Sequence, residues 1–433
     1  MARLLYSLAF YAAQPLIWLR LAWRARRQPD YLRHLGERYG FPATAAKGRL
    51  LWLHAVSVGE TRAAAPLIAA LLARYPDHCL LLTHMTPTGR ETGRLFVDRT
   101  PDRVVQAYLP YDLPDAVGRF LDHFRPELGL FMETELWPNL IAAAKSRRIP
   151  LALINARLSA RSQRGYARFA ALSRPAFAAL DRVCAQTAAD AERLQALGAR
   201  SPIVTGNLKF DVTPDAALLR QGSDWRQAFG ERPVWLVASS RDGEETLVLD
   251  ALREIGLPGL LLVLVPRHPQ RFDEVAALVT TRGLTLKRRS RDELPSADTK
   301  VWLGDSMGEM PAYYASADVA LIGGSLLPFG GQNLIEAAAC GCPVVVGPHT
   351  TNFAQAADDA VASGAARRIV GAEALASAVS EILNDGELRR AMKEQAIAFS
   401  HAHQGATART MAAVSALAAP AAPGEAPTAA TGR

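Results

Sequence analysis

The sequence lacks several features that would identify common classes of protein. It has only four cysteines, and their spacing matches neither a zinc site nor a disulfide framework. Its glycine-rich segment fits neither the dinucleotide fingerprint G-x-G-x-x-G nor the Walker A pattern, and the chain carries no DNA- or RNA-binding motif. These absences argue against NAD, ATP and nucleic acid as ligands. They also leave the cysteines as core residues in a reducing compartment, namely Cys79, Cys184, Cys340 and Cys342.

What the chain does contain is typical of a two-domain globular protein that meets an anion. It has 433 residues, of which 49% are hydrophobic and 21% are charged, enough for two full cores. Its net charge is +7, from 49 Lys and Arg against 42 Asp and Glu. Such an excess suits a phosphorylated substrate or an anionic membrane surface.

Short apolar runs alternate with helical stretches along most of the chain, which predicts parallel sheets covered on both faces. The pattern stops near residues 212–223 and then restarts, so we expect an α/β protein with two Rossmann-like domains facing a central cleft. The predicted divisions are residues 1–28, a membrane-associating helix; 29–212, the first α/β domain; 213–417, the second α/β domain with C-terminal helices; and 418–433, a disordered tail. The predicted strands are Leu50–His54, Cys79–Thr83, Val104–Leu109, Leu128–Met132, Leu151–Ile154, Val183–Ala185, Ile203–Thr205, Val234–Ala238, Leu261–Val265, Val301–Leu303, Val319–Ile322 and Val344–Val346.

The N-terminal segment Leu4–Trp23 is largely apolar and is followed by several arginines. A cleaved signal peptide is disfavoured because no clean cleavage site precedes the arginines. A single transmembrane helix is possible in length. We favour a helix lying in the membrane interface, because Arg20, Arg24 and Arg27 share one helical face and the tyrosines and tryptophans are of the kind that prefer the headgroup level.

The chain is organised around a glycine-rich segment that lies between the predicted strands Val319–Ile322 and Val344–Val346. Gly330 and Gly331 precede a predicted helix, Asn333–Cys340, and backbone N–H groups at such a junction favour a phosphate. Glu336 has two interpretations of about equal weight. It closes a capping box with Asn333, or it accepts hydrogen bonds from the ribose hydroxyls of a nucleotide.

Glu60 follows the first strand and lies in the first turn of the first long helix. Acidic residues are common there because the helix dipole stabilises them. The functional alternative is a general base, held ionised at neutral pH by the helix N-terminus and therefore weaker than a desolvated glutamate.

Other polar residues also follow predicted strands, at the sheet edge where such folds bind ligands. Each alone is weak evidence, because exposed charges are usually just solvated, but their shared placement is stronger. Lys209 is placed to stabilise a leaving phosphate, and Arg157 and Arg161 to bind a carboxylate or phosphate. The remaining candidates are Glu133, Glu135, Arg267 and the segment Asp305–Glu309.

A set of motifs in order resembles the bacterial Kdo transferases, from the N-terminal apolar segment to about residue 400. The motifs are Ser57–Glu60, Met85–Gly89, Tyr108–Pro114, Met132–Asn139, Asn155–Ser159, Leu208–Asp211, Pro266–Pro269 and Gly347–His349.

The resemblance implies a GT-B glycosyltransferase that moves 3-deoxy-D-manno-octulosonic acid (Kdo) from CMP-Kdo to the lipid A precursor, with inversion. Residues 29–212 would then be the Rossmann-like acceptor domain and residues 213–417 the Rossmann-like donor domain. It implies action on the cytoplasmic face of the inner membrane, anchored by the N-terminal helix, with no metal or other cofactor. Glu60 would be the base, and Glu133 and Lys209 would stabilise the transition state. The implied CMP contacts are Pro266, Arg267, Met307, Gly308, Glu309, Asn333, Leu334, Ile335 and Glu336.

Three positions depart from the family pattern. Gln332 and Leu334 stand where the family has histidine and proline, and Arg241 stands where histidine is expected. Two alternatives remain open: a nucleotide-sugar epimerase on the same fold, and a non-catalytic membrane-bound nucleotide-binding protein. Release of CMP only in the presence of a lipid acceptor would separate transfer from both.

Overall fold

A computed structural model describes residues 1–26, 28–45 and 48–418, and its contacts divide the chain into two compact units. The first unit contains residues 1–211 and the chain from Gly405 onward, and the second contains residues 212–404. The predicted donor domain, 213–417, therefore differs from the second unit at its C-terminal end. The predicted tail 418–433 lies outside the described residues except for Ala418, and so does Arg27.

The first unit is built on a seven-stranded parallel sheet with the order β3-β2-β1-β4-β5-β6-β7. Every residue of the central strand β4 is buried, as expected for a parallel strand covered on both faces. The order places β4 beside β1, so the loops after these two strands leave the same edge of the sheet. The strands are β1 Arg49–His54, β2 His78–His84, β3 Val104–Tyr108, β4 Leu128–Met132, β5 Leu151–Ala156, β6 Arg182–Ala185 and β7 Ile203–Val204.

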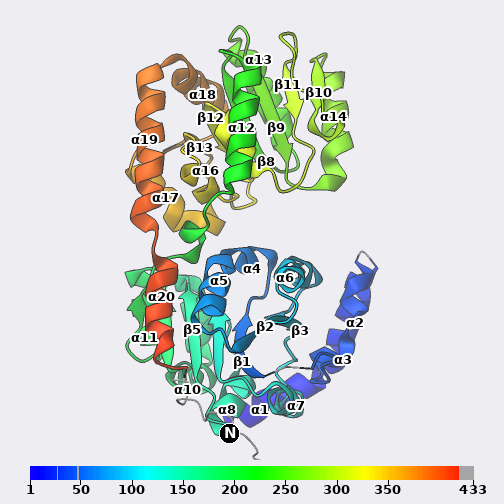
Figure 1. Cartoon of the computed structure of the whole chain (residues 1–433), viewed down its shortest axis with the longest axis vertical. Helices are drawn as coiled ribbons and strands as arrows, with labels where there is room; N and C mark the ends of the chain where they lie inside the picture. The colour runs from blue at the N-terminus through cyan, green and yellow to red at the C-terminus, as the bar shows by residue number, and fades with distance from the viewer. Residues whose placement is uncertain (27, 46–47, 419–433) are drawn as a thin grey trace, which may run out of the picture. The chain divides into compact units, whose positions relative to one another are not determined.

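Helices pack around this sheet and bury their apolar sides against it (Figure 1). Those of the first unit are α1 Ala2–Ala12, α2 Gln14–Ala25, α3 Leu35–Arg38, α4 Val58–Ala63, α5 Ala65–Arg74, α6 Pro87–Arg99, α7 Pro114–Phe124, α8 Pro138–Ser146, α9 Ala160–Arg168, α10 Ala170–Ala178, α11 Ala188–Ala196 and α20 Ala406–Ser415.

The second unit has its own seven-stranded parallel sheet, in the order β10-β11-β9-β8-β12-β13-β14. The strands are β8 Val234–Ser240, β9 Leu261–Pro266, β10 Leu286–Arg288, β11 Val301–Leu303, β12 Val319–Ile322, β13 Val344–Val346 and β14 Ala366–Arg368. Its helices are α12 Ala216–Phe229, α13 Glu244–Ile255, α14 Phe272–Thr281, α15 Met310–Ser316, α16 Ile335–Ala339, α17 Ala354–Ala362, α18 Leu375–Asn384 and α19 Gly386–His403.

The two parallel sheets confirm the α/β prediction, but two local predictions were wrong. The helical stretch after β1 is split into α4 and α5, because Pro66 in the first turn of α5 has no N–H to continue α4. The predicted helix Asn333–Cys340 is shorter. It begins at Ile335, whose N–H is capped by the Asn333 side chain at 3.1 Å, and ends at Ala339.

The N-terminal segment forms two helices, α1 and α2, which meet at an angle of 48° (Figure 1, dark blue). Among the described residues no single helix is long and apolar enough to cross a bilayer, although the bent pair together meets the length and composition of a span. The prediction of one continuous helix was therefore wrong. Both helices contact the first unit, through Ser7 and Asn139 at 3.1 Å and through Leu21 in a small apolar cluster. Their outer side chains stay exposed, including Leu4, Leu5, Leu8, Leu16, Leu19 and Trp23.

The last helix, α20, belongs to the first unit and not to the donor domain in which the sequence placed it. The Asp211 carboxylate accepts hydrogen bonds from the backbone N–H groups of Gly405, at 2.7 Å, and Thr407. Ala406 and Val414 are fully buried in the same apolar cluster as β1 and α5. The chain thus returns to complete the core of its first unit.

Candidate active site

Glu60 is held at the N-terminus of α4, directly after β1. Its carboxylate accepts a hydrogen bond of 2.6 Å from the backbone N–H of Val56 and one of 3.1 Å from the hydroxyl of Ser57. Ser57 is the N-cap residue and accepts in turn from the N–H of Glu60 at 3.5 Å. The S-x-x-E spacing is that of a capping box, so the sequence could have predicted Ser57 as the N-cap residue. The side chain of Glu60 is therefore fixed by its own loop.

Burial, not the helix dipole, controls the protonation of Glu60. It raises the pKa of this carboxyl from its ordinary 4.5 to about 7, and the negative charges of Glu133 and Glu135 add to the rise. The expectation of a group kept fully ionised by the helix N-terminus was therefore wrong. A carboxylate with a pKa near the working pH is a stronger general base than an ordinary glutamate.

Glu133 lies next to Glu60 because β4 neighbours β1 in the sheet. Its backbone is left-handed, with φ 59°, which a non-glycine residue adopts only when its surroundings impose it. The N–H of Glu133 donates to the carbonyl of Ile154 at 3.0 Å. Its carboxylate forms an ion pair with Lys209 at 3.5 Å. The structure thus brings Glu60, Glu133 and Lys209 together in the first unit.

Glu135, two residues further on, also carries a perturbed carboxyl. Burial raises its pKa to about 7, and the neighbouring charge of Glu133 adds to the rise. From the sequence, Glu135 was a candidate only because it lies two residues after Glu133. Its charge contributes to the raised pKa of Glu60.

The two candidate arginines of the first unit are less closely tied to this group. The side chains of Arg157 and Arg161 are exposed at the start of α9. The backbone carbonyl of Arg157 accepts a hydrogen bond from the Thr134 hydroxyl, which ties its loop to that of Glu133. Within the described part of the chain, no ion pair joins Arg161 to Glu60 or Glu133.

A loop after β2 supports the Glu60 loop, and the sequence indicated it only as part of the motif Met85–Gly89. The hydroxyl of Thr86 donates to the carbonyl of Val56 at 3.1 Å and accepts from the N–H of Gly89 at 3.1 Å. A Cβ at Gly89 would lie 2.8 Å from that same carbonyl, so only glycine allows α6 to approach so closely. Thr86 and Gly89 therefore fix the Val56 peptide, whose N–H binds Glu60.

The predicted donor residues lie at the carboxyl ends of strands in the second unit. Pro266 ends β9, and the N–H of Arg267 donates to the carbonyl of Ser240 at 3.0 Å. Met307 is exposed and Gly308 has a φ of 86°. The Glu309 carboxylate binds Gln221 at 2.6 Å and Arg289 at 2.9 Å. Glu309 is thus engaged within the protein.

The donor loop around α16 differs from the anion cradle that the sequence predicted. The N–H groups of Gly331 and Gln332 already donate to the carbonyls of Gly324 and Gly323, at 2.7 and 3.0 Å. A Cβ at Gly330 would lie 2.7 Å from the side-chain amide nitrogen of Asn352. The lack of a side chain at Gly330 therefore makes room for Asn352. With five residues, α16 also has a small dipole. These two N–H groups are thus engaged within the protein, and the phosphate site expected at this loop stays a prediction.

The remaining predicted residues of this loop differ in their burial. Leu334 and Ile335 are 1% exposed, so only their backbone can reach a ligand. Asn333 and Glu336 are half-buried. The Asn333 side chain accepts a hydrogen bond from the N–H of Ile335 at 3.1 Å, and both interpretations of Glu336 stay predictions.

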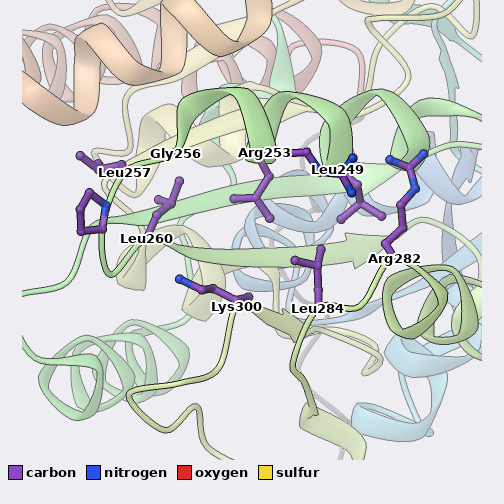
Figure 2. Close-up of a pocket in the computed structure, with 10 residues that line it drawn as sticks. Leu249, Arg253, Gly256, Leu257, Leu260, Arg282, Leu284 and Lys300 are labelled. Atoms are coloured by element: carbon purple, nitrogen blue, oxygen red, sulfur yellow. The ribbon is translucent and has the colours of Figure 1, made fainter.

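A cavity of about 240 Å³ lies elsewhere in the second unit (Figure 2). Leu260, Leu284 and Lys300 line it, and they precede β9, β10 and β11. The cavity is therefore at the amino ends of the strands, away from the edge where such sheets bind ligands. It contains none of the predicted site residues. Among the described residues no group of three or more His, Cys, Asp or Glu is placed to hold a metal ion.

Comparison with known proteins decides the family. Residues 33–212 match the family model described as 3-deoxy-D-manno-octulosonic-acid transferase (kdotransferase), and residues 281–399 match glycosyl transferases group 1. A 3-deoxy-D-manno-octulosonic acid transferase of Bordetella pertussis is 47% identical over 426 residues, which covers 96% of this chain and 99% of that protein. The chain belongs to the Kdo transferase family. The transferase is thus a glycosyltransferase of lipopolysaccharide biosynthesis, as the motifs indicated.

Solved structures place the fold of this Kdo transferase among two-domain nucleotide-sugar proteins. A glycosyltransferase of Rickettsia africae ESF-5 aligns with a TM-score of 0.59 at 12% identity, covering 86% of this chain and 98% of that one. A putative UDP-N-acetylglucosamine 2-epimerase of Listeria monocytogenes aligns with a TM-score of 0.57 at 15% identity, covering 86% and 96%. At these identities the likeness shows the GT-B type of fold alone, so the sequence relatives decide between transferase and epimerase.

Proposed function

We propose that the transferase moves Kdo from CMP-Kdo to a hydroxyl of the lipid A precursor lipid IVA, with inversion and with Glu60 as general base. The observation that carries the proposal is the half-buried carboxyl of Glu60, whose pKa is raised to about 7 beside the Glu133–Lys209 ion pair. A base poised at this value takes a proton from a sugar hydroxyl and returns it to solvent at neutral pH.

The reaction is a single displacement at the anomeric carbon of Kdo. As the acceptor oxygen bonds to that carbon, its proton passes to the Glu60 carboxylate. The bond from the anomeric carbon to the phosphate oxygen breaks, and CMP leaves with the electron pair. Glu133 and Lys209 stabilise the charges that develop in the transition state.

The donor is held by the second unit in this proposal. Glu336 accepts hydrogen bonds from the ribose hydroxyls, and the backbone at Pro266 and Met307–Glu309 surrounds the nucleotide. Arg267 lies at the same sheet edge as these groups. No metal is required, because one phosphate leaves and cationic side chains balance its charge.

We also propose that α1 and α2 bind an anionic bilayer, on the cytoplasmic face of the bacterial inner membrane. The support is the row of exposed leucines on the two helices, of which Leu16 is 68% exposed, with Arg20 and Arg24 on α2. An apolar face beside basic residues is typical of interfacial helices. A lipid acceptor would then be reached without leaving the membrane.

The test is incubation of the full-length chain with CMP-Kdo and tetraacylated lipid A precursor, with the products weighed by mass spectrometry. Mass gain of one or more Kdo residues, with CMP released only when acceptor is present, is expected. Glu60→Gln should lower turnover by about two orders of magnitude or more while keeping CMP affinity. The matched control is Glu192→Gln, an exposed glutamate of α11, which should leave turnover unchanged. Wild-type turnover in Glu60→Gln, or acceptor-independent isomerisation, would refute the proposal.

A further inference from the structure

The proposed donor is an anion and binds at the carboxyl edge of the second sheet. The glycine loop alone does not balance its charge, so a cationic side chain is needed there. Two of the N–H groups expected to bind phosphate are used inside the protein, by the carbonyls of Gly323 and Gly324. An anionic donor group must therefore be met mainly by side chains. Two candidates are the residues that depart from the family pattern, Arg241 and Gln332.

Arg241 and Gln332 lie next to each other although 90 residues of chain separate them. A Cβ at Gly324 would be 3.4 Å from Cγ of Arg241 and 3.3 Å from the amide nitrogen of Gln332. Both side chains therefore flank the same glycine, at the carboxyl ends of β8 and β12. This is the edge where a doubly wound sheet takes its ligand.

A fixed scaffold holds this pair in place. The buried carboxylate of Glu244 accepts from the N–H of Arg241 at 2.9 Å, from that of Gly324 at 2.6 Å and from that of Leu326 at 3.0 Å. The guanidinium carbon of Arg241 lies 4.6 Å from the centre of the Phe329 ring. The backbone on both sides of the pair and the stem of Arg241 are thus ordered before any ligand arrives.

The charge of Arg241 is uncompensated within the part of the chain that the structure describes. No carboxylate there lies within 4.0 Å of its guanidinium, and no side chain there bonds the amide of Gln332. By contrast, the nearby Arg271 is paired with Glu245 at 2.7 Å and Glu274 at 3.1 Å. A half-buried guanidinium with an adjacent amide and no partner has the composition of an anion site.

We infer that Arg241, assisted by the amide of Gln332, binds an anionic group of the nucleotide-activated sugar, either its phosphate or the carboxylate of the sugar. The inference rests on the proposed donor, CMP-Kdo, and adds to it a contact outside the residues predicted for CMP. Arg241 supplies a charge that does not titrate near neutral pH. Donor affinity through this contact is accordingly independent of pH between 6 and 8.

The test compares three ligands by calorimetric titration of the full-length chain: cytidine, CMP and CMP-Kdo. Arg241→Gln keeps a polar side chain at this position and removes the charge, together with the contact of the guanidinium with the Phe329 ring. Gln332→Glu places a carboxylate beside Arg241 and repels an anion. The matched control is Arg253→Gln, which removes the same charge from the opposite, amino-terminal edge of the sheet, beside the cavity (Figure 2).

If Arg241 binds the phosphate, both site variants weaken CMP about 10-fold or more and leave cytidine unchanged. The salt dependence of CMP affinity also becomes shallower, which a folding defect would not produce. If it binds the sugar carboxylate, only CMP-Kdo is weakened. Equal loss for cytidine, or no loss for any ligand, overturns the inference. A wild-type chain that binds neither CMP nor CMP-Kdo refutes the donor assignment itself, a separate and recognisable result.

Discussion

Neutralising the carboxyl of Glu60 is expected to stabilise the protein, in a way that depends on pH. The folded state holds the Glu60 proton with a pKa of about 7, whereas the unfolded chain holds it near 4.5. For a pKa raised on folding, the stabilising contribution is present below pH 4.5 and is lost as pH rises through 7. Glu60→Gln stays neutral at every pH and so avoids the loss.

The magnitude follows from the difference between the two pKa values. The rise from 4.5 to about 7 corresponds to about 3.4 kcal/mol at 1.36 kcal/mol per pKa unit. Since Glu60 is only half-buried, we expect Glu60→Gln to gain about 2–3 kcal/mol at pH 8, and under about 1 kcal/mol at pH 5. For a unit of this size the gain at pH 8 raises the melting temperature by about 4–12 °C.

Scanning calorimetry at pH 5 and pH 8 measures this difference on the transition of the first unit. The glutamine amide can keep both local hydrogen bonds, since its oxygen accepts from Val56 and its nitrogen donates to Ser57. The exposed Glu192→Gln should shift the transition by less than about 0.5 kcal/mol at either pH. Equal stability of Glu60→Gln and wild type at pH 8, or a gain that does not grow between pH 5 and pH 8, would refute the desolvated carboxyl.

Three further predictions concern the same groups. Glu133→Gln removes a negative charge beside Glu60, so the acidic limb of kcat/KM should move below pH 7, though not to 4.5 because burial is the larger cause; an unmoved limb would contradict this. Gly89→Ala should lower turnover and stability, because its Cβ would lie 2.8 Å from the backbone carbonyl of Val56. The control is Gly165→Ala on α9, whose Cβ would meet nothing within 4 Å. This control should stabilise the protein by about 0.5–1 kcal/mol in chemical denaturation. Glu336→Ala should weaken CMP binding in titration; unchanged affinity would leave this residue with no ribose contact.

The sequence predicted strands most accurately where every residue of the strand is buried. The run Leu128–Met132 is fully buried, and the structure has β4 over the same five residues. The sequence did not predict the edge strands β10 and β14. Each has only three residues, two of them basic, so neither forms an apolar run. Short edge strands are defined by pairing with a neighbour, and pairing is not written in the local sequence.

The site shows the same division. Placement of Glu60 and Glu133 after strands was readable, because the carboxyl ends of parallel strands share one edge. The raised pKa of Glu60 could not be predicted, because the helix-dipole argument considers only neighbouring residues of the chain, whereas burial results from tertiary packing. The occupied N–H groups of the glycine loop were hidden for the same reason, because their acceptors, Gly323 and Gly324, belong to the preceding strand end.

The return of α20 has a consequence for biosynthesis. Ala406 and Val414 fill the interior of a unit whose other residues precede position 212, so nearly 200 residues must leave the ribosome before that interior is whole. Nascent chains ending near residue 212 leave exposed the apolar side chains of β1 and α5 that α20 covers. The order of synthesis therefore differs from the order of assembly, and the unit that contains Glu60 is completed last.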